Sequence, residues 1–275
     1  MTRAEKLEQL QTLLRQCGRT VVAYSGGVDS AFLAKVAHDV LGAEMLAVIA
    51  DTPSLPRREL AEALDLAKQF GFAVRVIQTE EMGDTQYTSN PPNRCYFCKT
   101  ELFEKMAALA KSGRWQTIVY GENADDTGDF RPGTQAAVEC RVRAPLKEAG
   151  LTKAEVRALS AQFGLPTADK PAMACLSSRI PYGDPVTPQA LAMVEAAENV
   201  LRDRGFREVR VRHHRNLARI EVGVPEMFRW EDAELRAAVC EELKRIGYTY
   251  VTLDLQGYRT GSVNEVLATM KKVGQ

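Results

Sequence analysis

The sequence predicts an α/β protein, in which a parallel sheet with helices on both faces precedes a smaller α+β domain. Two patterns indicate the sheet: short apolar runs alternate with segments of helical periodicity, and the first run passes into a helix through two consecutive glycines. After residue 205, apolar residues alternate with charged ones, which is typical of strands with one buried face. We therefore expect a sheet domain over 1–164, a Pro-rich linker over 165–187 and a small α+β domain over 188–275.

In the first domain, the expected elements follow the order of an open α/β sheet. A capping box formed by Thr2 and Glu5 starts a helix, and apolar runs predict strands over 21–24, 45–51, 73–77 and 117–120. Helices are expected after the glycines, over about 57–70 and 98–110, and from a second capping box at Thr152 and Glu155. Because ligands of such sheets bind beyond the carboxyl ends of the strands, we expect the site at that edge.

The rest of the chain has a different pattern. Repeated prolines break any long element over 165–187, so this stretch is predicted to be a linker. Thr187 and Pro188 occupy the N-cap and first positions of a helix. Residues 209–212 and 219–222 form a predicted hairpin with one apolar and one charged face, and a helix over about 231–246 and a strand over 248–255 complete the small domain.

The segment Ser25-Gly26-Gly27-Val28-Asp29-Ser30 has the properties of an anion-binding turn. Its glycines let the backbone approach a ligand, and N–H groups at the helix start face it. Ser25 and Ser30 add hydroxyl donors, and Asp29 is a candidate magnesium ligand. The segment lacks the Lys of the P-loop and the three-glycine dinucleotide fingerprint. It resembles instead the PP-loop of ATP pyrophosphatases, which split ATP into AMP and pyrophosphate; the alternative is an ordinary Gly-rich turn.

Two more strand ends carry candidate ATP-binding residues. Asp51 ends the second strand, and Gly121 opens a loop over 121–133 that contains four acidic residues, with Asn123 and Asp126 as the candidates within it. A solvated surface turn has the same composition. The position directly after a strand favours a nucleotide or magnesium role.

Composition and charge exclude several classes of partner. The 36 Lys and Arg residues balance 36 Asp and Glu residues, so no net field attracts nucleic acid. No apolar run approaches the roughly 18 residues of a membrane span, and the N-terminus is unlike a signal peptide. We therefore expect a soluble, cytoplasmic protein that binds neither membranes nor nucleic acid.

Three of the six cysteines are candidate ligands. Cys95 and Cys98 form a C-x-x-C just before a predicted helix, and Cys175 lies in the linker. One C-x-x-C and three His are too few for an ordinary zinc site, and a Pro-Asn loop, not a strand, precedes the pair, unlike a thioredoxin-type dithiol. Three thiolates around a 4Fe–4S cluster would leave one iron open. A thiolate at Cys175 requires either iron coordination or a neighbouring cation such as Arg179.

Four motifs in one order resemble the LarE family, sulfur-inserting enzymes of nickel-pincer nucleotide (lactate racemase cofactor) biosynthesis. They are S-G-G-V-D-S, N-R-C-Y-F-C-K, G-E-N-A-D-D-x-x-D-x-R-P-G and A-C-L-S-S-R-I-P-Y-G. The resemblance implies that ATP adenylates a carboxylate of pyridinium-3,5-biscarboxylic acid mononucleotide and that Cys175 then supplies or handles the sulfur. Some members sacrifice the sulfur of that cysteine, and others hold a 4Fe–4S cluster on three cysteines; Cys95, Cys98 and Cys175 resemble the second kind. The family also implies a homohexamer.

The acceptor carries two carboxylates and a phosphate, for which Arg210, Arg212 and Arg259 are the candidate binding residues. Their alternative role is in a solvated sheet face, with Glu221 as an ion-pair neighbour. Three rival functions have to be distinguished: a PP-loop tRNA thiolase with a cluster, an ammonia-using adenylating ligase, and a non-catalytic nucleotide sensor.

Overall fold

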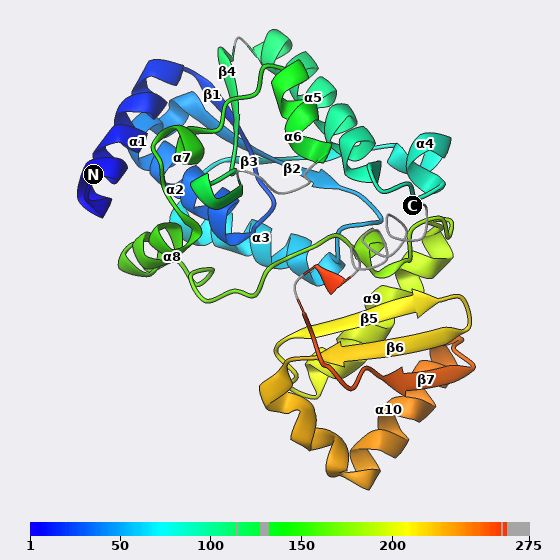
Figure 1. Cartoon of the computed structure of the whole chain (residues 1–275). Helices are drawn as coiled ribbons and strands as arrows, with labels where there is room; N and C mark the ends of the chain where they lie inside the picture. Colours follow the sequence, from blue (N-terminus) through cyan, green and yellow to red (C-terminus); the bar gives the residue numbers. More distant parts are fainter. Residues whose placement is uncertain (114, 127–131, 260, 263–275) are drawn as a thin grey trace, which may run out of the picture. The chain divides into compact units, whose positions relative to one another are not determined.

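The computed structural model describes residues 1–113, 115–126, 132–259 and 261–262. It divides the chain into two compact units (Figure 1). Unit 1 comprises residues 1–87 and 92–173, and unit 2 comprises residues 88–91 and the chain from residue 174 onward. The predicted linker is thus distributed between the units, with residues 165–173 in unit 1 and 174–187 in unit 2.

Unit 1 contains the predicted parallel sheet. Its strands are β1 (Thr20–Ala23), β2 (Met45–Asp51), β3 (Val74–Gln78) and β4 (Thr117–Tyr120), in the order β3-β2-β1-β4. All three pairings are parallel, and Val21 of β1 lies opposite Leu46 of β2 and Ile118 of β4. The predicted strands are therefore confirmed to within one residue at their starts and ends.

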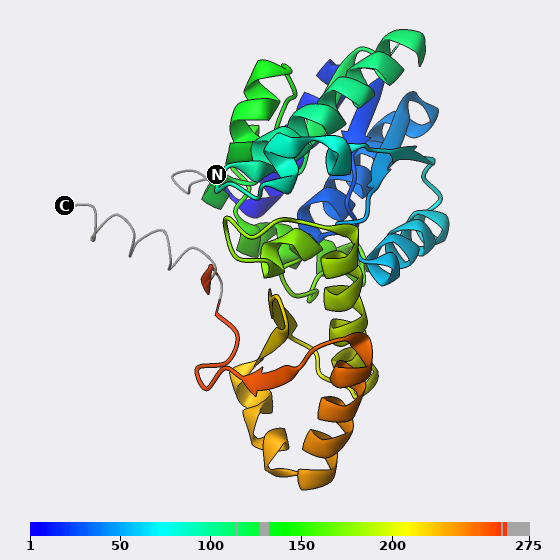
Figure 2. The same cartoon turned by 90° about the vertical axis from the view of Figure 1, so that its right-hand side faces the viewer.

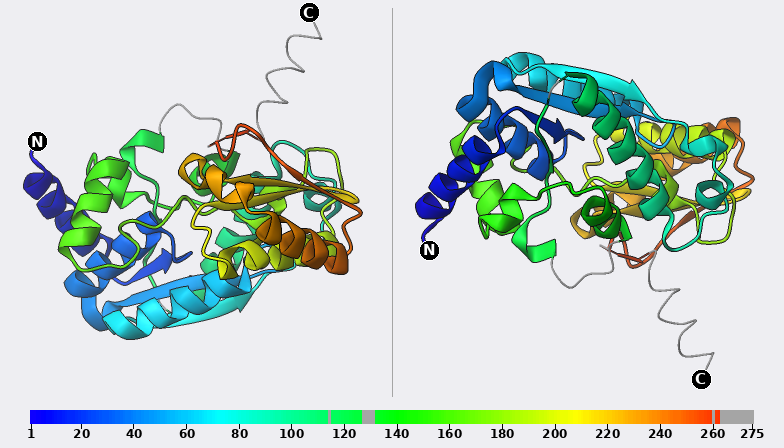
Figure 3. Two further views of the ribbon diagram at one scale, coloured as in Figure 1. Left: turned by 90° about the horizontal axis from the view of Figure 1, so that it is seen from below. Right: turned by 90° about the horizontal axis from the view of Figure 1, so that it is seen from above.

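Helices cover both faces of this sheet, as predicted (Figure 3). One face packs against α1 (Arg3–Cys17), α2 (Val28–Leu41), α3 (Arg57–Phe70) and α8 (Lys153–Gln162). The other packs against α5 (Arg94–Gly113) and α6 (Pro132–Glu139). Along β1, Val22 faces the first core and Val21 the second. Short elements complete the unit: η1 (Gly42–Glu44), η2 (Glu81–Gly83), α4 (Thr85–Thr88), η3 (Ala124–Asp126) and α7 (Pro145–Glu148).

Local signals placed the starts of α1, α2, α3 and α8 correctly. Both capping boxes are present: the hydroxyls of Thr2 and Thr152 accept from N–H groups three residues on, and Glu5 and Glu155 accept in return. The prediction was wrong for α5, which begins at Arg94 instead of about residue 98. Pro91 and Pro92 end the preceding segment, and nothing between residues 94 and 98 disfavours a helix, so the helix extends back to the prolines.

Unit 2 is a small α+β unit (Figure 2). Its sheet has the order β5-β6-β7, from β5 (Val209–His214), β6 (Leu217–Val222) and β7 (Tyr250–Leu253). The pair β5/β6 is the predicted antiparallel hairpin, whereas β6/β7 is parallel. Helices α9 (Pro188–Asp203) and α10 (Ala233–Ile246) pack on the apolar face. The remaining elements are η4 (Leu176–Arg179) and η5 (Val224–Glu231).

The charged face of the hairpin is buried, so the interpretation as a solvated sheet face was wrong. Arg210 and Arg212 of β5 are 5% and 6% exposed, and Glu221 of β6 is fully buried. Tyr258, Ser262 and Ser178 of η4 supply several of the groups that contact these side chains. Alternation along a strand identifies the two faces, but whether the polar face meets solvent depends on what else packs there.

Among the residues described, no helix is long and apolar enough to span a membrane.

Candidate active site

The Gly-rich turn forms a compact loop between β1 and α2. Gly26 has φ of +72°, and a Cβ at this position would lie 2.6 Å from Cβ of Ala63, so only glycine fits. The hydroxyl of Ser30 accepts from the backbone N–H of Ser25 at 3.1 Å and lies 3.0 Å from the Ser25 hydroxyl. Gly27 is the N-cap of α2 and has no side chain to engage the first-turn N–H groups. These groups and the helix dipole are suited to bind an anion.

A cavity of about 540 Å³ opens beside this loop within unit 1. Seven of the nine residues predicted to bind ATP line it: Ser25, Gly27, Asp29, Ser30, Gly121, Asn123 and Asp126. They come from three segments that meet at the carboxyl edge of the sheet. A cavity of this size is within the usual range for small-molecule sites.

Gly121 lies against the backbone at the start of α2. A Cβ at this position would lie 2.9 Å from the backbone nitrogen of Ser30 and 3.0 Å from the carbonyl carbon of Asp29. No side chain larger than hydrogen fits without displacing the start of α2. The strand end and the Gly-rich turn are thus held together by a backbone contact.

Asp29, the predicted magnesium ligand, lies in a network of polar contacts. Its carboxylate accepts from Nδ2 of Asn123 at 3.3 Å and forms an ion pair with Lys153 at the start of α8. Asn123 is itself buried, and its Oδ1 accepts from the N–H of Asp125 at 3.0 Å. The backbone N–H of Asn123 donates to Asp126 at 3.1 Å. The acidic loop is therefore built into the cavity wall.

Asp51 lies apart from the residues that line the cavity. Its carboxylate forms an ion pair with Arg57 and accepts from Nε2 of Gln78 at 3.0 Å. The hydrogen bond from Arg57 holds the pKa of Asp51 below its ordinary value. Gly26 is likewise absent from the cavity lining and acts through the shape of the loop.

Sequence reasoning missed two cationic residues of this cavity, Lys99 and Lys153. Nζ of Lys99 lies 5.1 Å from the ring centroid of Tyr120, which also lines the cavity. Lys99 directly follows Cys98 in the N-R-C-Y-F-C-K motif, a signal that was available. Lys153 follows its capping residue Thr152, but nothing local relates it to Asp29, which is 124 residues earlier.

The three candidate cysteine ligands come from both units. Cys95 and Cys98 lie near the start of α5, three residues apart and hence on one side of the helix. Cys95 is exposed and Cys98 is half-buried. Cys175, which is exposed, lies in unit 2 and is the N-cap of η4. None of the chain's cysteines is in a disulfide. Thiols at accessible positions suit iron–sulfur ligation chemically.

Within either unit, the described residues include no group of three His, Cys, Asp or Glu side chains gathered as a metal site.

Arg179 contacts the backbone around Cys175, and its charge is paired with another residue. Nε and Nη2 donate to Glu198 at 2.7 and 3.1 Å, and this ion pair is almost completely buried. Nη1 donates to the carbonyls of Ala174 and Cys175 and to the hydroxyl of Ser178. Burial lowers the pKa of Arg179, but the charge and hydrogen bonds of Glu198 outweigh it and raise the pKa above its ordinary value.

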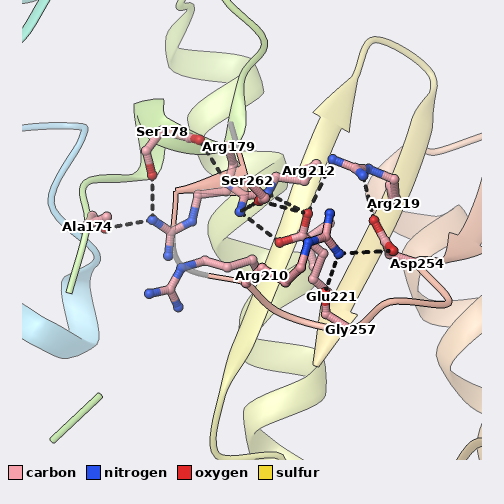
Figure 4. Close-up of polar contacts among 12 residues, drawn as sticks. Ala174, Ser178, Arg179, Arg210, Arg212, Arg219, Glu221, Asp254, Gly257 and Ser262 are labelled. Atoms are coloured by element: carbon pink, nitrogen blue, oxygen red, sulfur yellow. Dashed lines mark hydrogen bonds and ion pairs between the residues drawn. The ribbon is translucent and has the colours of Figure 1, made fainter. Parts of the chain in front are cut away.

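Two of the three arginines predicted to bind substrate are buried side by side on β5 (Figure 4). Arg212 forms a bidentate ion pair with Glu221 at 3.0 and 2.7 Å and also donates to Ser262. The guanidinium of Arg210 lies 4.9 Å from the ring centroid of Tyr258. Burial lowers the pKa of Arg210, and the positive charge of Arg179 adds to this effect.

Arg259 is half-buried and lies 3.7 Å from the carboxylate of Asp254. It donates to the carbonyl of Gly257 at 3.3 Å. Arg219 also pairs with Asp254 and with Glu221. Together these side chains form the arginine cluster of unit 2, which comprises Arg179, Arg210, Arg212, Arg219 and Arg259. Its arginines outnumber the neighbouring carboxylates Glu198, Glu221 and Asp254, so the cluster carries a net positive charge.

Comparisons with known proteins agree with these features. The family model described as NAD synthase matches residues 5–111, which include the Gly-rich turn. The chain is 45% identical over 262 residues to the uncharacterised protein slr1717 of Synechocystis sp., covering 95% of this chain and 98% of that protein. It is 36% identical over 267 residues to the pyridinium-3,5-bisthiocarboxylic acid mononucleotide synthase of Lactiplantibacillus plantarum, covering 97% and 96%.

A more distant similarity is confined to part of the chain. The tRNA-specific 2-thiouridylase MnmA of Xanthobacter autotrophicus is 32% identical over 193 residues, covering 56% of this chain and 49% of that enzyme.

Proposed function

The chain belongs to the LarE family of PP-loop enzymes, and on that basis we propose that it is an ATP-dependent sulfurtransferase of nickel-pincer nucleotide biosynthesis. It would convert carboxylates of pyridinium-3,5-biscarboxylic acid mononucleotide to thiocarboxylates. The observation that carries the proposal is similarity over nearly the full length of the Lactiplantibacillus synthase, together with a cavity lined by the Gly-rich turn. By family resemblance, we also propose a cytoplasmic homohexamer whose product serves the maturation of a lactate racemase.

The reaction begins with activation of a carboxylate. A carboxylate oxygen of the substrate attacks the α-phosphorus of ATP, the bond from that phosphorus to the bridging oxygen breaks, and pyrophosphate leaves. The oxygen that must be replaced thereby becomes part of an AMP leaving group. N–H groups at the start of α2, with Ser25 and Ser30, would stabilise the departing pyrophosphate.

Cations in the cavity would balance the charge of the phosphates. Lys99 and Lys153 line it, and Asp29 and Asp126 supply oxygens of the kind that magnesium prefers. Magnesium bound with ATP would compete with Lys153 for Asp29. We propose that Lys153 then turns to a phosphate oxygen. Asp51, which lies outside the cavity lining, would act by shaping the end of β2.

Sulfur delivery is assigned to Cys175. A sulfur nucleophile attacks the acyl carbon, the bond from that carbon to the AMP oxygen breaks, and AMP leaves with the electron pair. Where Cys175 itself is the donor, loss of its Cα proton and cleavage of its Cβ–S bond then release the thiocarboxylate and leave dehydroalanine. Cys175 is exposed and hence accessible to a substrate. The charge of Arg179 is paired with Glu198, so we assign Arg179 to the backbone of this segment and not to stabilising a thiolate.

We propose further that Cys95, Cys98 and Cys175 hold a 4Fe–4S cluster. The spacing of the first two on one side of α5 and the accessibility of Cys95 and Cys175 support this. Held by these three cysteines, a cluster would leave one iron without a protein ligand and would thereby supply a place for an exogenous sulfide. Iron analysis tests it: anaerobically purified protein should contain about four irons per chain and absorb visible light. A colourless, iron-free preparation that still transfers sulfur would assign the sulfur to Cys175 itself.

The substrate's phosphate and second carboxylate would bind to the arginine cluster of unit 2. Arg210, Arg212 and Arg259 are the proposed contacts, supported by the net positive charge around them. An anion there would offset the repulsion between Arg210 and its neighbouring guanidinium groups.

The test is substitution of Cys175 by Ala. We expect acyl-AMP and pyrophosphate to form while no thiocarboxylate appears in mass spectra. The control is Cys240→Ala, another unpaired thiol in unit 2, which should transfer sulfur as the wild type does. Undiminished sulfur insertion by Cys175→Ala would refute this assignment.

A tRNA thiolase is the second candidate, because MnmA is similar over part of the chain. Tight, salt-dependent binding of tRNA in a gel-shift assay, with a thionucleoside formed on ATP addition, would favour it over the mononucleotide substrate.

A further inference from the structure

The backbone around Cys175 is anchored while its thiol is exposed. Nη1 of Arg179 donates to the carbonyl oxygens of Ala174 at 2.7 Å and Cys175 at 3.0 Å, and to the hydroxyl of Ser178 at 2.9 Å. The Cys175 carbonyl also accepts from the N–H of Ser178 at 3.0 Å. One guanidinium group therefore sets the path of the chain on both sides of the reactive cysteine.

Glu198 connects this anchor to the strand that carries the arginine cluster. It lies on α9, is fully buried, and accepts Nε and Nη2 of Arg179. Its Oε1 also accepts the backbone N–H of Val211 at 3.1 Å. Val211 lies on β5 between Arg210 and Arg212. A single carboxylate thus links the Cys175 segment to the backbone of that strand.

A second connection runs between the same two segments. Nη1 of Arg212 donates to the carbonyl oxygen of Ser178 at 3.0 Å (Figure 4). The Cys175 segment is therefore tied to β5 at two points, one through Arg179 and Glu198 and one through Arg212. Two separate ties restrain both the distance and the orientation between the segments.

We infer that Glu198 and Arg179 are positioning residues that hold the sulfur of position 175 in register with the substrate-binding arginines of β5. The inference rests on the proposed function for what is positioned, although the ties themselves are independent of it. Effective sulfur transfer needs the acyl carbon and the sulfur in a near-attack arrangement, which a substrate anchored on β5 achieves only if the Cys175 segment is fixed relative to β5.

The chemistry of the pair favours positioning over simple stabilisation. A buried ion pair is often no more stabilising than well-packed apolar residues, so its stability contribution does not explain its presence. A planar guanidinium can bond a carboxylate on one edge and carbonyl oxygens on the other, which an ammonium group cannot do. Burial raises the pKa of Glu198, but the charge and hydrogen bonds of Arg179 outweigh this and keep the carboxylate ionised.

The test compares Arg179→Lys with a matched control, Arg204→Lys. Lysine keeps the charge beside Glu198 but loses the fork to the carbonyls. Arg204 has the same kind of contacts in the same unit, an ion pair with Glu242 and a donated bond to the carbonyl of Val200. Hydrogen–deuterium exchange of the amides of Ser178 and Ile180, both in the hydrogen-bonded turn, is measured in each variant. Fluorescence of Trp230, which lies in unit 2 with both substituted residues, serves as the check of folding.

We expect faster exchange of these amides in Arg179→Lys only, with sulfur transfer reduced by about 100-fold, the size of effect that a small misplacement of a reacting group produces. Unchanged exchange, or equal loss of sulfur transfer in both variants, would overturn the inference. If the wild-type protein transfers no sulfur, the proposed function fails, but the exchange result still decides whether Arg179 positions the segment.

Discussion

At the scale of single residues, the ion pair between Asp29 and Lys153 shows how opposite charges in the cavity are paired. The carboxylate predicted to hold magnesium is bound to a lysine ammonium and an Asn amide. The two charges meet because the starts of α2 and α8 both reach the cavity. In the proposed function, magnesium that arrives with ATP would displace the ammonium from the carboxylate and leave it available for a phosphate.

Substitution of Lys153 by Ala should therefore weaken ATP binding. A hydrogen bond to a charged group contributes about 1.5–3 kcal/mol, so we expect the Kd for ATP to rise about 10- to 100-fold. Isothermal titration calorimetry measures it. Lys147→Ala is the control, since Lys147 pairs with Glu122 in the same unit and does not line the cavity. Equal affinities of Lys153→Ala and the wild type would exclude a phosphate contact.

A second residue-scale prediction concerns Gly121. A Cβ at this position would collide with backbone of α2, so Gly121→Ala should displace the Gly-rich turn and reduce the free energy of unfolding by about 1–3 kcal/mol. Urea unfolding and ATP titration should both detect the change. Gly83→Ala is the matched control, because a Cβ there meets no atom within 4 Å. Normal ATP binding by Gly121→Ala would mean that the turn tolerates the displacement.

At the scale of elements, the capping boxes correctly indicated where two helices begin. The capping boxes at Thr2 and Thr152 have the same chemistry, yet only the second precedes a residue of the cavity. The N–H of Lys153 also donates to Asp125 at 2.8 Å, which ties α8 to the acidic loop. The position of a functional side chain here depends on where its helix begins.

The two caps allow a direct comparison. Loss of an N-cap hydroxyl costs about 1 kcal/mol, so Thr2→Ala and Thr152→Ala should reduce the free energy of unfolding by similar amounts. Only Thr152→Ala should also weaken ATP binding, because fraying of α8 releases Lys153 from its position. Urea unfolding and calorimetric titration give the two quantities. ATP affinity that changes equally in the two variants would contradict this separation.

At the scale of the whole molecule, the two units carry their polar groups differently. In unit 1 the charged groups of the candidate site line a cavity, whereas in unit 2 charged side chains pack against one another beneath other segments. Buried ion pairs make stability depend on pH, because a carboxylate must stay ionised to balance its partner. Unit 2 should therefore be the more acid-sensitive part of the chain.

The Arg179–Glu198 pair determines the sign of this effect. The pKa of Glu198 lies below its ordinary value of 4.5, so its contribution is fully present above pH 4.5 and is lost as pH falls through the lower folded-state pKa. Glu198→Gln should lower the free energy of unfolding by about 3–5 kcal/mol at pH 7, because Arg179 loses its charge partner. The decrease should be smaller in acid, where Glu198 of the wild type is itself protonated. Urea unfolding of unit 2, followed by Trp230 fluorescence in a Trp115→Phe background, measures it. A cost that stays constant from pH 7 to pH 3 would contradict this assignment.

Much of the sheet domain and its site was predictable because it depends on local chemistry. Apolar runs specified four strands, Gly26 and Gly27 specified the turn, and strand ends specified where Asn123 and Asp126 would be found. In a parallel sheet, the topology itself brings strand ends to one edge. That is why residues about 100 positions apart could be assigned to one cavity in advance.

The sequence by itself thus determined the parallel sheet, the Gly-rich turn and seven of the residues that line the cavity, since each follows from periodicity and backbone conformation. Only the tertiary structure decided that Lys153 pairs with Asp29 and Arg179 with Glu198, and that the pair of Arg212 with Glu221 is buried. Partners of buried charges are chosen by packing between segments distant in the chain, and a local pattern of charged residues carries no information about what will cover them.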